Sequence, residues 1–163
     1  MALTLRPIDP DDQDFLLTVY AGTRAAALAS LPWDAAQKAA LIHSQFHAQH
    51  AYYQAHYHGA DFGLILIDDR PVGRLYVARW NDEIRLVDIA LLPAYRGRGI
   101  GSALVQTLLA EAAQAGKPVR LHVEKHNPAL RWYERLGFRR RADRGGYWFL
   151  EWSPLGPQGT SAS

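Results

Sequence analysis

The sequence contains no cysteine and a single methionine. Without cysteine the protein has no disulfide framework, no thiolate metal ligand and no cysteine nucleophile. It also lacks a long apolar run, and its first residues do not show the charged-then-apolar pattern of a secretory signal. We therefore expect a cytoplasmic protein with no membrane partner.

Net charge is also low, because 18 Lys and Arg residues against 16 Asp and Glu residues give a formal charge of +2 at pH 7. That excess is too small to predict a nucleic-acid partner. The basic residues gather instead at Arg96 and Arg98 and at Arg139–Arg141, which favours a local anionic ligand. The length of 163 residues predicts one domain, over residues 1–153, followed by a polar and disordered tail at 154–163.

Hydrophobic periodicity predicts an α/β (α+β) order of elements. The predicted strands are Leu3–Arg6, Phe62–Ile67, Val72–Ala78, Ile84–Leu92, Val119–Val123, Phe138–Arg141 and Tyr147–Trp152. The predicted helices run from Asp9-Pro10 to about Leu28, from Ala35 to about His58, from about Gly99 to Ala115, and from Ala129 to Leu136. A helix crosses between the strands at 84–92 and 119–123, so these two strands should be parallel.

The most informative stretch is Arg96-Gly97-Arg98-Gly99-Ile100-Gly101, between an apolar strand and an amphipathic helix. Glycines at a helix start permit a tight turn and leave amide groups bare. The first amides of a helix lack intrahelical partners and lie at the positive end of its dipole. Together with the two arginines they favour a polyanion such as a pyrophosphate. The alternative is an ordinary glycine-rich turn with two solvated arginines.

His43, His47 and His50 form a stripe on the second predicted helix, beside an apolar face. Their spacing of four and three residues would suit a metal ion, but the stripe supplies no carboxylate and the chain has no HExxH pattern. We therefore expect no metal site, and interpret the stripe as a half-exposed flank of a cleft.

Two stretches resemble the signatures of the GCN5-related N-acetyltransferase (GNAT) superfamily. The run Pro-Ala-Tyr-Arg-Gly-Arg-Gly-Ile-Gly at 93–101 is similar to the Arg/Gln-x-x-Gly-x-Gly signature. The run from Asn127 to Phe138, which ends in Tyr-Glu-Arg-Leu-Gly-Phe, is similar to the second signature. The order of elements matches as well, over about Leu3 to Trp152. The resemblance implies the GNAT fold: a mixed central sheet of about seven strands, with a β–α–β core splayed at the cofactor slot, and about four helices.

The resemblance further implies acetyl-CoA as co-substrate. Arg96 and a series of main-chain amides would hold its pyrophosphate. The amides are those of Gly97, Arg98, Gly99, Ile100, Gly101 and Ser102.

For the rest of the coenzyme, the backbone edge of Ile89, Ala90 and Leu91 would pair with the pantetheine arm as an added strand. The amide of Leu91 would stabilise the oxyanion. Asn127 would contact the arm, and Tyr133 would face the sulfur as general acid. Asn127 precedes Tyr133 by six residues, whereas many members of the family have seven, which weakens the assignment of Asn127 alone.

The implied reaction is direct attack of an amine on the thioester, which requires loss of the ammonium proton. His122 is the first candidate base, because it alternates with Leu121 and Val123 and resembles by position the glutamate base of some family members. A histidine packed on the sheet face is the alternative interpretation. Glu83, Asp88 and a water chain are the other candidates for the base.

The acceptor site should lie between the first two helices and the closing hairpin, where Arg24, Trp33, Tyr53 and Tyr57 are available to line it. Core packing is the competing role for these side chains. The chain has no acidic cluster of the kind that binds a polyamine or an aminoglycoside. A small-molecule amine and a peptide or protein amine both remain open as acceptor, as do acyl groups other than acetyl and a monomeric or homodimeric state.

Two functions from other classes are considered. A dinucleotide-binding oxidoreductase would need a glycine where Ser102 stands, and its first glycine would follow the strand directly, whereas residues 93–96 intervene. A P-loop NTPase is excluded because no lysine follows the glycines. A non-catalytic CoA-binding or regulatory module remains the main alternative, although the presence of Tyr133 weighs against it.

Overall fold

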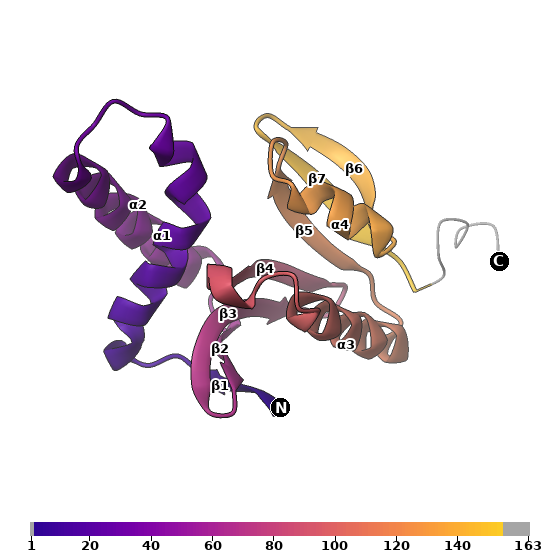
Figure 1. Cartoon of the computed structure of the whole chain (residues 1–163). Helices are drawn as coiled ribbons and strands as arrows, with labels where there is room; N and C mark the ends of the chain where they lie inside the picture. The colour runs from indigo at the N-terminus through magenta and orange to yellow at the C-terminus, as the bar shows by residue number, and fades with distance from the viewer. Residues whose placement is uncertain (1, 155–163) are drawn as a thin grey trace. The chain divides into compact units, whose positions relative to one another are not determined.

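The computed structural model describes residues 2–154. The predicted disordered tail, apart from Pro154, lies outside the described residues. The chain forms seven strands, four α-helices and two 3-10 turns (Figure 1). The strands are β1 (Leu3–Pro7), β2 (Asp61–Ile67), β3 (Arg70–Arg79), β4 (Ile84–Leu91), β5 (Val119–Glu124), β6 (Arg139–Arg144) and β7 (Tyr147–Trp152). The helices are α1 (Gln13–Ala29), α2 (Ala35–His56), α3 (Ile100–Ala115) and α4 (Ala129–Arg135), with 3-10 turns η1 (Pro10–Asp12) and η2 (Pro93–Tyr95).

The strands form one mixed sheet in the order β1-β2-β3-β4-β5-β7-β6. The β4–β5 pair is parallel and joins Ile84–Arg85 to Val119–Arg120, as the crossing helix predicts. The pairs β1–β2, β5–β7 and β6–β7 are antiparallel. The predicted mixed sheet of seven strands with four helices is therefore confirmed.

The chain divides into two compact units and passes from one to the other within β3, within β4 and within α3. The first unit is the chain up to Tyr76 together with Asp88–Gly101. Its helices α1 and α2 lie side by side (Figure 1) and pack around a buried core. The members of that core are Leu16, Tyr20, Phe46, Leu64 and Leu66.

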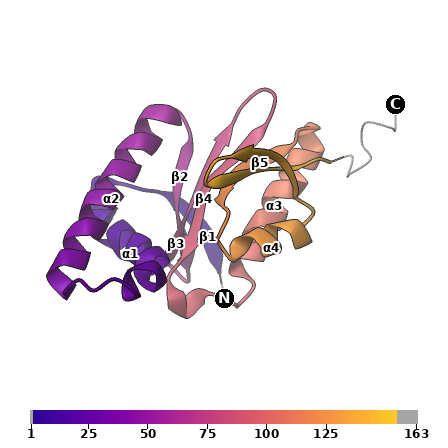
Figure 2. The ribbon, with the colours of Figure 1, turned by 90° about the horizontal axis from the view of Figure 1, so that it is seen from above.

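The second unit is Val77–Val87 together with the chain from Ser102 onward. The short helix α4 runs beside β5 in both ribbon views (Figure 2). On β5 the side chains of Leu121 and Val123 are buried, and the alternate residue His122 is exposed. This alternation is the one that the sequence predicts.

Local signals explain several boundaries. Asp9 and Asp12 form a capping box over η1, so the first helix begins with a 3-10 turn rather than as one continuous α-helix from Pro10. Asp34 caps α2 in the same way, with Gln37 as its partner. The last hairpin differs most from the expectation, because β6 extends to Arg144 and carries a register shift between Arg140 and Ala142.

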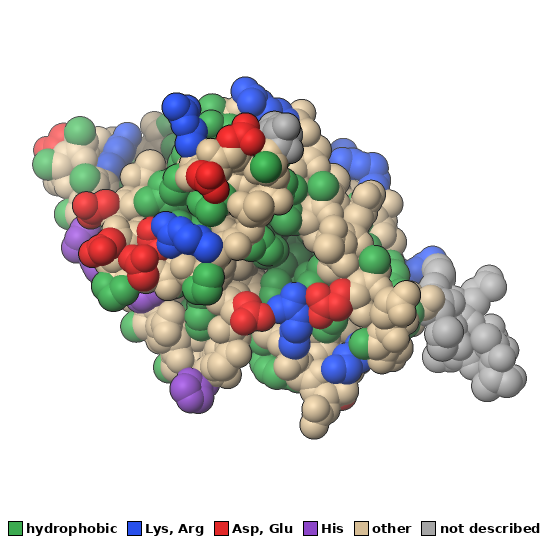
Figure 3. Space-filling model, turned by 90° about the horizontal axis from the view of Figure 1, so that it is seen from below, with side chains coloured by type: hydrophobic (Ala, Val, Ile, Leu, Met, Phe, Trp, Pro, Cys, Tyr) green, Lys and Arg blue, Asp and Glu red, His purple; other side chains and the backbone are tan. Residues whose placement is uncertain are grey.

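Charged side chains of both signs are interspersed on the face that Figure 3 draws, in keeping with the small net charge. Among residues 2–154, no helix combines the length and the apolar character needed to cross a membrane.

Candidate functional site

The glycine loop leads directly into α3, as predicted. Gly97 and Gly99 have φ angles of +72° and +79°, in the left-handed region that favours glycine. Both residues are exposed, and α3 begins at Ile100, immediately after Gly99. The first amides of α3 have no carbonyl of an earlier helical turn to bind. The loop thus presents bare amides at the positive end of a helix of 16 residues.

The two arginines of this loop behave differently. Arg96 Nε donates to the carbonyl oxygen of Leu91 at 3.2 Å, and its guanidinium lies near Gly22 of α1. Arg96 therefore ties the loop to the end of β4. Arg98 lies over the ring of Tyr95, with Cζ 5.2 Å from the ring centroid, and is exposed. Both arginines are exposed, so each guanidinium group is accessible to an anionic ligand.

β3 approaches the end of β4 closely, at Gly73. A Cβ atom at Gly73 would overlap the carbonyl oxygen of Ala90 and would come within 3.1 Å of the Cα atom of Leu91. Leu92 N donates to Val72 O at 2.8 Å, which fixes the end of β4 against β3. Only glycine allows this approach, so Gly73 sets the backbone position of Ala90 and Leu91. Sequence reasoning missed Gly73, because a glycine inside a strand signals a close approach only as a general tendency.

Asp88, a candidate base, is engaged in a buried network of unit-one side chains. It accepts hydrogen bonds from Arg74 Nη2 at 2.9 Å and Nε at 3.2 Å, and from the Tyr53 hydroxyl at 2.8 Å. Arg74 is only 3% exposed and also donates to Gln49 Oε1 at 2.8 Å. Burial, and then the charge of Asp88, raise the pKa of Tyr53 far above its ordinary value, so this hydroxyl stays protonated and donates. A structural role accounts for Asp88 completely.

Glu83, the other carboxylate candidate, is 6% exposed and serves two arginines. Its Oε2 accepts from Arg85 Nε at 2.8 Å, and its Oε1 accepts from Arg120 Nη1 at 3.0 Å. Burying a carboxylate is costly unless it is paired, and the two guanidinium partners of Glu83 meet that requirement. We interpret Glu83 as a structural ion-pair partner.

His122 remains the best-placed candidate base. Its ring lies 4.8 Å from the ring of Phe149, the residue paired with it on β7. Partial burial, followed by the positive charges of Arg85 and Arg144, lowers the pKa of His122 below its ordinary value of 6.5. A lowered pKa keeps the imidazole neutral at pH 7, which is the form that accepts a proton.

Tyr133 lies on α4 and is 8% exposed. Its ring packs 4.8 Å from that of Trp132 and 5.6 Å from that of Phe138. Trp132 Nε1 donates to the Ser102 hydroxyl at 3.0 Å, which ties α4 to the start of α3 within the second unit. The side-chain oxygen of Asn127 accepts a hydrogen bond from the amide of Ala129 at 2.9 Å and so supports the start of α4.

The residues predicted to line the acceptor site lie in the first unit, where Arg24, Tyr53 and Tyr57 have partners of their own. Arg24 Nε donates to the Tyr20 hydroxyl at 3.1 Å, and Trp33 is 42% exposed. The rings of Tyr53 and Tyr57 lie 6.0 Å apart. These contacts show packing on α1 and α2 and leave the lining role as an expectation.

The histidine stripe on α2 is partly exposed. His43 and His47 are exposed with their Nε2 atoms 3.3 Å apart, whereas His50 is half-buried and stacks on Phe46 at 6.0 Å. Burial, then nearby positive charge, lowers the pKa of His50. Within residues 2–154 no three His, Asp or Glu side chains are grouped as a metal site requires.

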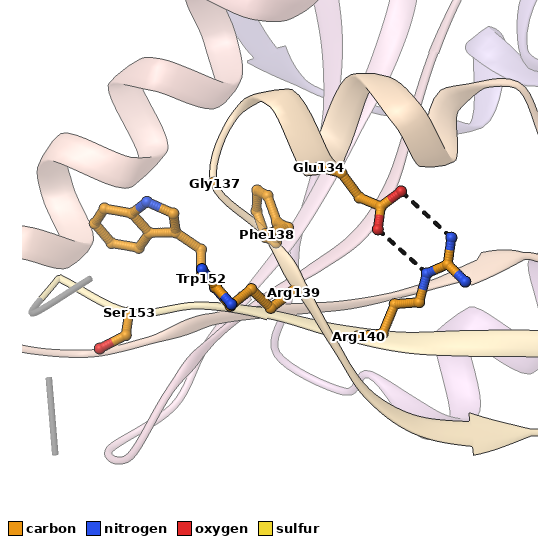
Figure 4. A pocket seen from close by; sticks show the side chains of 7 residues that line it. All are labelled: Glu134, Gly137, Phe138, Arg139, Arg140, Trp152 and Ser153. Carbon is orange, nitrogen blue, oxygen red and sulfur yellow. Dashed lines mark hydrogen bonds and ion pairs between the residues drawn. The ribbon is translucent and has the colours of Figure 1, made fainter. Parts of the chain in front are cut away.

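A cavity of about 520 Å³ opens in the second unit, between the end of α4 and the ends of β6 and β7 (Figure 4). The Glu134–Arg140 ion pair borders it, with Arg140 Nε 3.2 Å from Glu134 Oε2. The lining residues are Glu134, Gly137, Phe138, Arg139, Arg140, Trp152 and Ser153. None of the predicted catalytic or coenzyme-binding residues is among them, although the lining residue Phe138 contacts the ring of Tyr133.

Known proteins resemble the chain in sequence and in fold. Residues 25–138 match the model of the acetyltransferase (GNAT) family. The chain is 40% identical over 78 residues to a mycothiol acetyltransferase of Clavibacter sepedonicus, a match that covers 45% of this chain and 25% of that protein. It is 35% identical over 68 residues to the [ribosomal protein bS18]-alanine N-acetyltransferase of Haemophilus influenzae, over 41% of this chain and 47% of that protein. The matches thus span less than half of these relatives.

The fold is similar to the crystal structure of PaiA N-acetyltransferase from Thermoplasma acidophilum in complex with coenzyme A. The TM-score is 0.70 and the sequence identity 18%, with 94% of this chain and 99% of that chain covered.

Proposed function

Because the chain belongs to the acetyltransferase (GNAT) family, we propose that it is an acetyl-CoA-dependent N-acetyltransferase that moves the acetyl group directly to a primary amine. The main observation behind this proposal is the loop at 97–101. Two of its glycines adopt the left-handed conformation, and the loop leads into the N-terminus of α3, whose first amides have no intrahelical partner. Such a terminus binds a diphosphate through main-chain amides and the helix dipole. The relatives are named acetyltransferases, which supports acetyl as the transferred group.

In this proposal the loop amides from Gly97 to Ser102 bind the pyrophosphate, with the exposed Arg98 as a cationic partner. Arg96 acts chiefly by holding the loop to Leu91. The main chain of Ile89, Ala90 and Leu91 pairs with the pantetheine arm, with Asn127 beside it, and the Leu91 amide faces the oxygen that becomes negative. A bound acetyl-CoA supplies the acyl group as an activated thioester.

The reaction requires the acceptor amine to lose a proton, and we assign that step to His122. An alkylammonium acceptor has a pKa of about 10.4, so deprotonating it at pH 7 costs about 4–5 kcal/mol. His122, neutral because its pKa is lowered, accepts that proton. The amine nitrogen then bonds to the acetyl carbon as the carbon–sulfur bond breaks. The acylated nitrogen gives up its second proton, the thiolate takes up one proton to become the thiol, and coenzyme A and the N-acetyl amine leave.

Tyr133 stabilises the leaving sulfur. A phenol with a pKa of about 10 protonates a thiolate with a pKa of about 8.5 only at a cost of roughly 2 kcal/mol. We therefore assign Tyr133 a hydrogen bond to the sulfur rather than a completed proton transfer.

The test is a titration with acetyl-CoA, followed by thiol release and mass spectrometry over a panel of primary amines. Thiol release with an acetylated amine is the expected result. Binding without thiol release on any amine would indicate a non-catalytic CoA-binding module, and binding of a nicotinamide dinucleotide in place of acetyl-CoA would indicate an oxidoreductase.

A pair of glycine variants locates the binding site. Gly99→Ala should weaken acetyl-CoA binding at least tenfold, because alanine disfavours the left-handed conformation that orients the loop amides. Gly59→Ala is the matched control, since Gly59 has a φ of +81° and open space around its Cβ position. Equal effects of the two substitutions would show that backbone strain alone is responsible.

A further inference from the structure

A cluster of positive charge surrounds one aromatic ring in the second unit. The ring is that of Phe149 on β7, and Arg144 of β6 and Arg85 of β4 lie over it, with Cζ atoms 4.6 and 5.3 Å from the ring centroid. His122 of β5 contacts the same ring at 4.8 Å. We call these four residues, Arg85, His122, Arg144 and Phe149, the Phe149 cluster. It places two guanidinium groups around the proposed base.

This part of the sheet has fewer carboxylates than guanidinium groups. Glu83 is shared by Arg85 and Arg120, and Glu151 is shared by Arg120 and Arg141. The next acidic residue of β5, Glu124, has an interaction of its own. No carboxylate within residues 2–154 forms an ion pair with Arg144.

The aromatic ring does not remove this positive charge. Cation–π contact holds a guanidinium over a ring but leaves its forked N–H donors available. Arg85 donates its Nε to Glu83, and its guanidinium also lies over the ring of Trp80, with Cζ 5.1 Å from the centroid. The partner that these donors fit is a carboxylate, which arginine binds with two parallel hydrogen bonds.

We propose that the amine acceptor carries a carboxylate and that Arg144, aided by Arg85, binds it beside His122; this inference rests on the proposed acetyl transfer. An acceptor anchored by its carboxylate at Arg144 presents its nearby amino group to the imidazole. The same charges repel polyamines and other polycations, because like charges in one site cost binding energy. The acceptor class is therefore an amino acid or a similarly compact amino-carboxylate.

The experiment measures kcat/KM for matched amines that differ by one carboxylate: phenylalanine against 2-phenylethylamine, and tryptophan against tryptamine, with spermidine as polycation. We expect the carboxylate member of each pair to be preferred at least tenfold and spermidine to be the poorest substrate. In Arg144→Gln the preference ratio should fall at least tenfold, and Arg144→Lys should recover part of it. Comparing ratios between variants cancels the intrinsic difference in amine basicity.

Arg70→Gln is the matched control, because Arg70 is an exposed arginine at the start of β3 and its loss changes the net charge equally. Its preference ratio should equal that of the unmodified protein. The inference is overturned if Arg144→Gln leaves the ratio unchanged. It is also overturned if that substitution raises only the KM for acetyl-CoA, which would assign the cluster to a coenzyme phosphate.

A binding measurement separates this inference from the proposed function. N-acetylphenylalanine should bind the protein, and Arg144→Gln should weaken it at least tenfold, whether or not any amine is turned over. Binding lost in the variant without turnover of any amine would support the anion site while contradicting acetyl transfer. If Arg144→Gln binds N-acetylphenylalanine as tightly as the unmodified protein does, the carboxylate site is contradicted and the proposed acetyl transfer is not affected.

Discussion

Arg74 and Asp88, on neighbouring strands, form an ion pair of 2.9 Å in which the arginine side chain is 3% exposed and the aspartate side chain 14%. The Tyr53 hydroxyl and the Gln49 side chain complete the hydrogen bonding, so α2 is joined to β3 and β4 through polar groups. Buried charges are tolerated when each has its partner, and removing one partner leaves the other uncompensated.

Asp88→Asn should therefore lower the free energy of unfolding by about 3–5 kcal/mol. The matched control is Glu111→Gln, which breaks the Arg79–Glu111 pair, exposed at 42% and 41%, and should cost less than about 1 kcal/mol. Urea denaturation of both variants measures the difference. Similar losses in the two would show that the Arg74–Asp88 pair behaves as a surface pair.

Gly73→Ala should raise the KM for acetyl-CoA at least tenfold. The added methyl group would push against the Ala90 carbonyl and shift the main chain that we propose pairs with pantetheine. Gly146→Ala, where the same methyl group meets no atom within 4 Å, is the control and should leave KM unchanged. Steady-state kinetics with urea denaturation separate a local shift from a loss of folding. A KM at the unmodified value in a folded Gly73→Ala protein would remove β4 from the coenzyme site.

The pH dependence of kcat/KM should report the lowered pKa of His122. A base with a pKa below 6.5 is neutral at pH 7 and becomes protonated only at lower pH, so kcat/KM should fall on the acid side of pH 6.5. His122→Gln should remove this limb and reduce kcat/KM by about a hundredfold. Because the charge of Arg144 contributes to the lowering, Arg144→Gln should move the limb to higher pH.

His58→Gln, which alters an exposed histidine after α2, serves as control for that experiment and should keep the limb in place. An acid limb that survives in His122→Gln would assign the base to another group or to water.

Tyr133→Phe should lower turnover at least tenfold while leaving acetyl-CoA binding nearly unchanged, because only the hydroxyl is lost and the buried ring keeps its contacts with Trp132 and Phe138. Tyr147→Phe removes an exposed hydroxyl as a control. Single-turnover kinetics and calorimetric titration measure the two effects separately. An unchanged rate would exclude the Tyr133 hydroxyl from the reaction.

Most of the fold could be predicted from local patterns in the sequence. The glycine loop before α3, the capping residue Asp34 and the alternation around His122 depend on neighbouring residues only, so the sequence predicts them directly. The parallel β4–β5 pair also followed, because a helical crossover between two strands restricts their direction.

Contacts between distant residues could not be predicted in this way. The choice between a base and a structural carboxylate at Asp88 depends on Arg74 and Tyr53, which the chain brings from 14 and 35 residues away. The role of Gly73 depends on the carbonyl of Ala90, and the two guanidinium groups over Phe149 come from two different strands, β4 and β6. Periodicity and capping carry no information about such pairs.

The chain passes back and forth between its two compact units, so residues of one unit leave the ribosome at different times. When a ribosome has released only the chain up to Tyr76, Arg74 has emerged but Asp88 has not. Its guanidinium must then stay hydrated, and the β3 edge uncovered, until the remainder of β4 follows. We therefore expect nascent chains that stall before Asp88 to fold incompletely and to be substrates for chaperones and proteases.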